Sequence, residues 1–102
     1  MGIYFEVLGC LGVKIRTSKS HWLFIVKRKH PEVNGLEQEV QLTLLRPESI
    51  RLSQDDKDVY LYYSRVSKYY LCVVCRHLNG EGFIITSYIT NKIKEGKEVW
   101  KK

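Results

Sequence analysis

The second half of the chain is a series of closely spaced β-forming runs, and this feature constrains the fold more than any other. Four runs after Pro47 are rich in β-branched and aromatic residues, and they cover residues 49–53, 58–64, 68–77 and 82–90. Short connections separate the runs, and the last connection contains Asn79-Gly80, a pair typical of tight hairpins. Consecutive strands with such short connections predict an antiparallel meander.

The first half combines a short β-hairpin with two helical patterns. Residues 3–9 and 13–16 are predicted strands around a turn. In residues 18–29, Ser18 suits an N-cap and cations occupy the last turn, where the helix dipole favours them. The apolar run WLFIV at 22–26 also fits a buried strand, but its polar flanks favour a helix.

Prolines close both helical patterns. Pro31 restricts His30 to extended backbone and ends the first helix. Residues 36–46 predict the second helix because apolar side chains recur along one face, and Pro47 stops it.

These patterns together predict an α+β fold. Its two N-terminal helices pack on one face of an antiparallel sheet of about four strands, with a short β-hairpin at the N-terminus. Residues 1–102 are expected to form a single domain, with a basic tail at 91–102.

The charge balance favours a polyanionic partner. Seventeen Lys and Arg face eleven Asp and Glu, which gives a formal net charge of +6. Nucleic acid, an anionic membrane and an acidic protein all fit this charge. No apolar run approaches the ~18 residues of a membrane span, and the N-terminus lacks the basic region and apolar block of a signal peptide. We therefore expect no membrane association and a cytoplasmic location.

The three cysteines predict neither a disulfide framework nor a metal site. The chain has an odd number of cysteines, namely Cys10, Cys72 and Cys75, which argues against a disulfide framework. Cys72 and Cys75 lie in a strand-like run, where residues three apart point to opposite faces, so they are not arranged as a metal-binding pair. We expect them to be small core residues. Histidine spacings typical of metal sites and phosphate-binding glycine loops are missing. Neither a metal nor a cofactor is therefore predicted, which leaves metal-free acid–base chemistry as the enzymatic hypothesis.

His30 has two interpretations. It lies within the run "KRKHPE" (27–32), directly after Arg28 and Lys29. It is either the polar end of a helix or an acid–base group, because histidine titrates near neutral pH, and the adjacent cations would suit a phosphate.

The last strand and its neighbours supply further candidates. Thr86 and Tyr88 alternate with Ile85, Ser87 and Ile89, so they form either a solvent-facing side of the sheet or a ligand-binding face. Arg76 is either a surface residue at a strand end or a bidentate phosphate ligand. Tyr62 offers a further hydroxyl, although most of the seven tyrosines are expected to serve ordinary strand packing.

Several of these segments also resemble a known family. The stretches "HW..IVKRKHPE", "LLRPESI", "VYLYY", "YYLCVVCR" and "GEGFIITSYITNKIKEG..VW" cover nearly the whole chain. They resemble small prokaryotic and phage-borne proteins of the barnase–EndoU–colicin–RelE-like nuclease superfamily. The resemblance implies two N-terminal helices and a four-stranded antiparallel sheet. It also implies a metal-independent RNase, in many cases a toxin inhibited by an antitoxin or immunity protein.

The resemblance assigns roles to individual residues. His30 matches the histidine of the His-Pro-Glu motif, and Thr86 and Tyr88 match a threonine and a tyrosine of the terminal strand. The family pattern places a second histidine two positions after the helix tryptophan, where this chain has Phe24. If that position is catalytic in relatives, this chain is inactive or uses a different base; if it is structural, nothing is lost.

The resulting hypothesis is RNA cleavage by transesterification through a 2′,3′-cyclic phosphate. His30 would transfer a proton, while Arg76, Lys29 and Arg28 would stabilise phosphoryl charge. Thr86 and Tyr88 would position the phosphate or orient a base, and Tyr62 would add a hydroxyl. The expected partners are RNA, such as tRNA or mRNA, and an acidic antitoxin or immunity protein. The competing hypothesis is a non-catalytic module that binds RNA or an acidic protein with the same basic surface.

Overall fold

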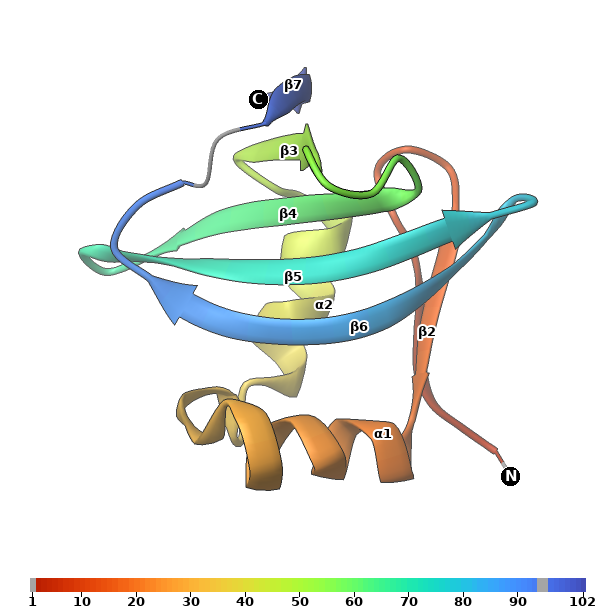
Figure 1. Cartoon of the computed structure of the whole chain (residues 1–102). Coiled ribbons are helices and arrows are strands. Elements are labelled where there is room, and N and C mark those ends of the chain that lie inside the picture. The colour runs from red at the N-terminus through yellow and green to blue at the C-terminus, as the bar shows by residue number, and fades with distance from the viewer. Residues whose placement is uncertain (1, 94–95) are drawn as a thin grey trace.

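The computed structural model describes residues 2–93 and 96–102. Within these ranges the strands form one seven-stranded mixed sheet, in the order β1-β2-β6-β5-β4-β3-β7 (Figure 1). The strands are β1 (Ile3–Leu8), β2 (Lys14–Ser18), β3 (Ser49–Leu52), β4 (Val59–Val66), β5 (Tyr69–Leu78), β6 (Glu81–Thr90) and β7 (Lys97–Lys101). β2 and β6 run parallel, and the other neighbouring pairs are antiparallel.

The meander β3–β6 follows the predicted runs closely. Its last turn has Asn79 and Gly80 at φ of 54° and 81°. Positive φ at both central residues is the geometry that favours an Asn-Gly hairpin, so this prediction is confirmed.

The predicted α+β architecture, with two helices on a four-stranded antiparallel sheet, is wrong, because both ends of the chain join the sheet. The N-terminal hairpin is attached through the parallel pairing of β2 with β6. Residues 97–101 of the expected basic tail form β7, which pairs with β3, while residues 94–95 lie outside the described part. A four-stranded meander leaves unpaired backbone groups along both edges, and β2 and β7 cover part of each.

The helical segments are shorter than predicted and less regular. They are α1 (Lys19–Phe24), the π-helical η1 (Ile25–Lys29), the 3₁₀-helical η2 (Pro31–Val33) and α2 (Glu37–Leu45). The Ser18 hydroxyl accepts a hydrogen bond from the His21 N–H at 3.1 Å, as expected of an N-cap. At the other end the His30 N–H reaches back to the Ile25 carbonyl at 2.7 Å, a wide π-type turn before Pro31.

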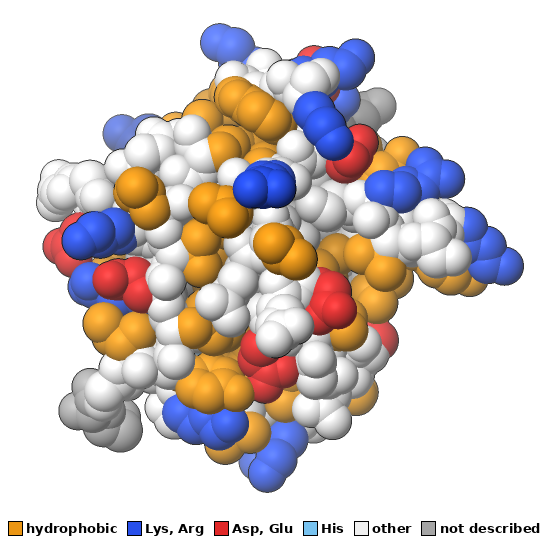
Figure 2. Space-filling view, turned by 180° about the vertical axis from the view of Figure 1, so that it is seen from behind, with side chains coloured by type: hydrophobic (Ala, Val, Ile, Leu, Met, Phe, Trp, Pro, Cys, Tyr) orange, Lys and Arg blue, Asp and Glu red, His pale blue; other side chains and the backbone are white. Residues whose placement is uncertain are grey.

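The sheet has two differently covered faces. The covered face carries α2 and the main core, which contains Ile15, Trp22, Ile25, Val26, Val33, Val40, Leu44, Ile50, Tyr62, Leu71, Val73, Cys75 and Ile84. The open face carries a smaller buried cluster of Leu61, Tyr63 and Cys72. Cys72 and Cys75 thus lie on opposite faces, as strand geometry predicts. Figure 2 views the molecule from the side of α2, where some hydrophobic side chains remain exposed among cations.

α1 and η1 run beside the part of β6 that β2 leaves unpaired (Figure 1). The parallel register ends at Arg16 and Phe83. Two residues further on, the Ile85 carbonyl is hydrogen-bonded to the His21 Nε2 at 2.9 Å. A side chain of α1 therefore reaches β6 beyond the end of the β2 pairing, and η2, which follows His30, lies against the same strand.

Gly82 is predicted to be required for the β2–β6 contact. A Cβ at this position would lie 2.8 Å from the Ile15 Cγ1 and 3.2 Å from the Val13 Cγ1. We expect Gly82→Ala to lower the free energy of unfolding by about 1–3 kcal/mol, as overpacking does. Gly2→Ala, which meets nothing within 4 Å, is the control. Urea unfolding would measure both, and an unchanged midpoint for Gly82→Ala would contradict the close contact.

Candidate functional site

The open face contains a hollow of about 280 Å³ between β6 and the β3–β4 loop. Its lining consists of Ser53, Gln54, Asp55, Val59, Leu61, Val74, Thr86 and Tyr88. Thr86 and Tyr88 share this face because they are two residues apart on one strand. The structure therefore brings these two predicted site residues together in one concave surface, which we call the open-face hollow.

Thr86 has an unsatisfied hydroxyl. Its Oγ1 is buried and has no hydrogen-bond partner among the described residues. Buried polar atoms are nearly always paired, so an orphan hydroxyl that lines a hollow is suited to a polar ligand atom.

Tyr88 is a neutral hydrogen-bond donor at this site. Burial raises the pKa of Tyr88 strongly, and the neighbouring Cys72 and Tyr63 raise it further. The phenol therefore stays protonated throughout the physiological range, where it can donate but cannot act as a base.

His30, at the end of η1, lies beside Tyr88. Its ring lies 5.4 Å from the Tyr88 ring, centroid to centroid, at an interplanar angle of 38°. The wide turn of η1 and the restricted backbone before Pro31 place it beside β6, where β2 no longer pairs. The structure thus brings His30 and Tyr88 into contact although 58 residues separate them in sequence.

Glu32 is a further residue of the site, and sequence reasoning gave it no role. Its carboxylate lies 3.3 Å from the His30 Nδ1. A carboxylate at this nitrogen favours the tautomer that carries a proton on Nδ1 and leaves Nε2 free. The signal was present in the His-Pro-Glu motif, but a two-residue spacing does not fix which nitrogen faces the acid.

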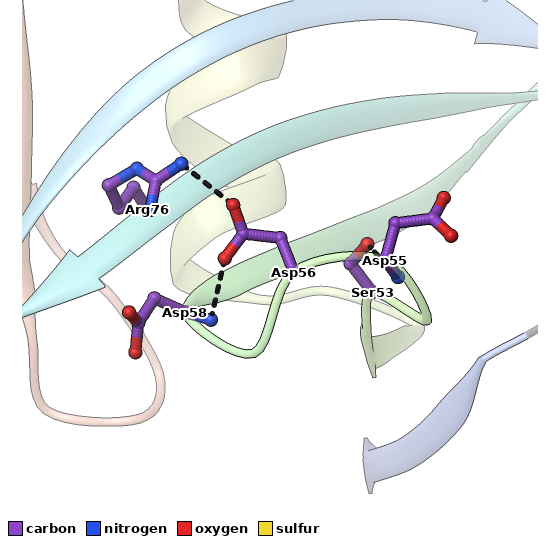
Figure 3. A network of polar contacts seen from close by, with 5 residues as sticks. All are labelled: Ser53, Asp55, Asp56, Asp58 and Arg76. Carbon is purple, nitrogen blue, oxygen red and sulfur yellow. Dashed lines mark hydrogen bonds and ion pairs between the residues drawn. The ribbon is translucent and has the colours of Figure 1, made fainter.

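Arg76 faces the open side at a distance from this pair. Tyr88 on β6 pairs with Cys72 on β5, and Arg76 lies four residues after Cys72 on β5, where it pairs with Phe83. Tyr88 and Arg76 are therefore about 13 Å apart along the strand direction. The Arg76 Nη2 donates to the Asp56 carboxylate at 2.8 Å (Figure 3). The structure therefore does not place Arg76 with His30, and an acid already occupies its guanidinium.

The β3–β4 loop forms an acidic wall. Asp56 accepts a hydrogen bond from the Asp58 N–H at 3.2 Å and a second from Arg76 (Figure 3). These contacts, the Asp58 bond first, lower the pKa of Asp56. The Asp55 N–H donates to the Ser53 hydroxyl at 3.2 Å, and the Asp55 side chain lines the hollow. Carboxylates in the β3–β4 loop disfavour binding of a phosphate at this end of the open-face hollow and favour hydrogen-bond donor groups of a ligand.

Tyr62 lies on the covered face, away from the hollow. It is fully buried, and its hydroxyl is hydrogen-bonded to the His77 Nε2 at 3.1 Å. The His77 ring in turn stacks on Tyr60 with centroids 4.2 Å apart. Tyr62 therefore belongs to the main core. Successive residues of a strand point to opposite faces of the sheet, and its neighbours Leu61 and Tyr63 point to the open face.

The two predicted phosphate-binding cations lie on η1. Arg28 and Lys29 are both exposed, and the Lys29 Nζ lies 5.7 Å from the centre of the Phe24 ring. Lys29 directly precedes His30 and Arg28 precedes Lys29, so the structure keeps both cations at the edge of the site.

Comparison with protein-family models, curated proteins and solved structures finds no match to this chain. In residues 2–93 and 96–102, no helix is long and apolar enough to cross a membrane. The same residues contain no group of three or more His, Cys, Asp or Glu side chains that could hold a metal ion.

His77 is predicted to make stability depend on pH. Burial lowers the pKa of His77, so the unfolded chain binds this proton more readily than the folded protein. Its contribution to stability is fully present above about pH 6.5 and is lost as the pH falls toward the folded-state pKa. We expect His77→Gln to show a smaller drop in Tm than wild type between about pH 7.5 and 5.5. Equal drops would contradict this assignment.

The orphan hydroxyl of Thr86 is predicted to cost stability. Thr86→Val keeps the shape and removes the unsatisfied oxygen, so the free energy of unfolding should rise by about 1 kcal/mol. Thr43→Val is the matched control, because the buried Thr43 hydroxyl donates to the Glu39 carbonyl at 2.8 Å and its loss should bring no gain. Urea unfolding measures both, and destabilisation by Thr86→Val would show that its hydroxyl is satisfied.

Proposed function

We propose that this chain is a metal-independent RNA endonuclease that cleaves by general acid–base transesterification. The observation that carries the proposal is the contact of His30 with Tyr88, 5.4 Å between rings, beside the orphan Thr86 hydroxyl. A proton-transfer group in ring contact with Tyr88, a neutral donor that shares the open-face hollow with an unsatisfied hydroxyl, fits a phosphodiester better than an apolar ligand. The resemblance of "HW..IVKRKHPE" and of the Thr86–Tyr88 strand to the nuclease superfamily also supports it.

In this proposal His30 is the general base. The Glu32 carboxylate at Nδ1 leaves Nε2 free to take the proton of the 2′-hydroxyl. The 2′-oxygen attacks the adjacent phosphorus, and the bond to the 5′-oxygen breaks. The products are a 2′,3′-cyclic phosphate and a free 5′-hydroxyl.

Tyr88 and Thr86 serve as donors in the same step. The Tyr88 hydroxyl, which burial keeps protonated, supplies the proton to the leaving 5′-oxygen. The Thr86 hydroxyl donates to a phosphoryl oxygen that gains charge in the transition state. The proton on His30 restores Tyr88 through solvent and completes the cycle.

The cations act around this centre. Lys29 and Arg28, next to His30 in the chain, hold the phosphate from the solvent side. Arg76 lies about 13 Å along the sheet and is engaged by the Asp56 carboxylate at 2.8 Å, so it takes no part at this phosphate. Tyr62 has no role in this mechanism, because it is buried on the covered face.

The proposed partners follow from charge and from the resemblance. The substrate is a cellular RNA, such as tRNA or mRNA, and the protein works in the cytoplasm. A net charge of +6 suits an acidic antitoxin or immunity protein that covers the open face.

Loss of His30 or Tyr88 is predicted to slow cleavage strongly. Wild type should cleave total RNA in the presence of EDTA and leave 2′,3′-cyclic phosphate ends. His30→Ala should lower the cleavage rate about 10²- to 10⁴-fold, and Tyr88→Phe about 10²- to 10³-fold. His77→Gln, which removes a histidine on the covered face, is the matched control and should keep the rate.

RNA binding and sensitivity to EDTA distinguish the proposed enzyme from the alternatives. Absence of cleavage together with RNA binding that His30→Ala leaves intact would replace the enzyme with a non-catalytic binding module. Binding to RNA should in either case weaken steeply with salt through counterion release. Cleavage that EDTA abolishes would contradict the metal-independent mechanism.

A further inference from the structure

Two phenylalanine rings are exposed beside cations along the edge of β6. Phe24 on α1 is 47% exposed and Phe83 on β6 is 38% exposed. The Lys29 Nζ lies 5.7 Å from the Phe24 centroid, and the Arg16 guanidinium lies 4.8 Å from the Phe83 centroid. Single exposed apolar residues are ordinary, so the significance of these two depends on their arrangement.

His21 connects the two phenylalanines into one surface. Its ring stacks on Phe24 with centroids 6.3 Å apart and an interplanar angle of 29°. With Phe83 and Arg16 it also lines a second hollow, of about 410 Å³, where β2 and β6 diverge. We call Phe83, His21 and Phe24 the aromatic row.

The aromatic row leads toward the proposed catalytic pair. Its helical end continues through η1 to His30, which contacts Tyr88. Its strand end lies on β6, the strand that also carries Thr86 and Tyr88. The hydrogen bond between the His21 Nε2 and the Ile85 carbonyl, 2.9 Å long, holds the two parts together. The row is therefore a fixed surface on both sides of the edge of β6.

We propose that the aromatic row binds unpaired bases of a single-stranded RNA that flank the scissile phosphate. Exposed rings beside cations are the general means of binding unpaired nucleic acid, because bases stack on the rings and the cations contact the backbone. Bases inside a duplex are already stacked and cannot reach such rings. The substrate class is therefore RNA that is unpaired around the cleavage site.

The two ends of the row differ in charge. Arg16 is already paired with Glu81 at 2.8 Å, so the Phe83 end offers a stacking surface rather than a phosphate site. Lys29 stands over Phe24 with no acidic partner among the described residues, so the Phe24 end suits both a base and its phosphate. This inference rests on the proposed function for the position of the cut, but its binding surface can be tested separately.

The test measures binding with RNA that cannot be cleaved. A fluorescent strand with 2′-O-methyl groups at every position lacks the attacking hydroxyl, and anisotropy titration gives its Kd. We expect Phe24→Ala and Phe83→Ala each to weaken binding about tenfold, in the range found for loss of one stacked base. The same strand annealed to its complement should bind wild type more weakly and should not respond to either substitution.

Tyr69→Ala is the matched control. Tyr69 is 43% exposed, with the Lys68 Nζ 5.8 Å from its ring, so it reproduces an exposed aromatic beside a cation. It lies at the start of β5, outside the row, and its loss should leave the Kd unchanged. Thermal unfolding of each variant would show that the fold is retained.

Each outcome separates the two proposals. Equal Kd values for wild type, Phe24→Ala and Phe83→Ala would overturn the aromatic row, while the cleavage test on unmodified RNA decides the enzyme independently. Weakened binding without any cleavage would keep the row and remove the catalytic function. Preference for the duplex, or an equal loss with Tyr69→Ala, would also overturn the row.

Discussion

The parallel pairing of β2 with β6 determines how the rest of the molecule is arranged. It covers three residue pairs, from Lys14–Glu81 to Arg16–Phe83, and then stops. Because the pairing is short, the first part of β6 is joined to the N-terminal hairpin and the second part needs another neighbour. α1 bonds to this part through His21 and η2 packs against it, and the path between them brings His30 to Tyr88. The glycine at position 82 permits this pairing, since any side chain there would meet Ile15.

Much of the secondary structure could be predicted from the sequence. Period-two patterns, the Asn79-Gly80 turn and the Ser18 cap depend on local chemistry, and each has its expected geometry. The sheet as a whole could not be predicted. A parallel contact between strands more than sixty residues apart leaves no local signal, and "KEVWK" carries too weak an alternation to distinguish an edge strand from a basic tail.

The candidate site was partly predictable for the same reason. Strand parity placed Thr86 and Tyr88 on one face, and the structure has them in one hollow. Parity could not tell which face α2 covers, so it could not show that Tyr62 points into the main core, away from the open face that carries Tyr63. Nor could it show that Asp56 would engage Arg76, because that ion pair depends on how the β3–β4 loop folds back. The sequence did not predict a role for Glu32, because that role depends on the distance from its carboxylate to the His30 Nδ1.

The hydrogen bond of the His21 side chain to the Ile85 carbonyl has a consequence for local unfolding. In a continuous sheet a neighbouring strand would satisfy that carbonyl, but here one side chain of α1 does so. Lifting α1 and η1 from β6 would leave a mid-strand acceptor unpaired and would also separate His30 from Tyr88. Such segments tend to open as cooperative units. Amide exchange in α1, η1 and the second half of β6 should therefore rise and fall together, so that one opening event would dismantle the whole edge.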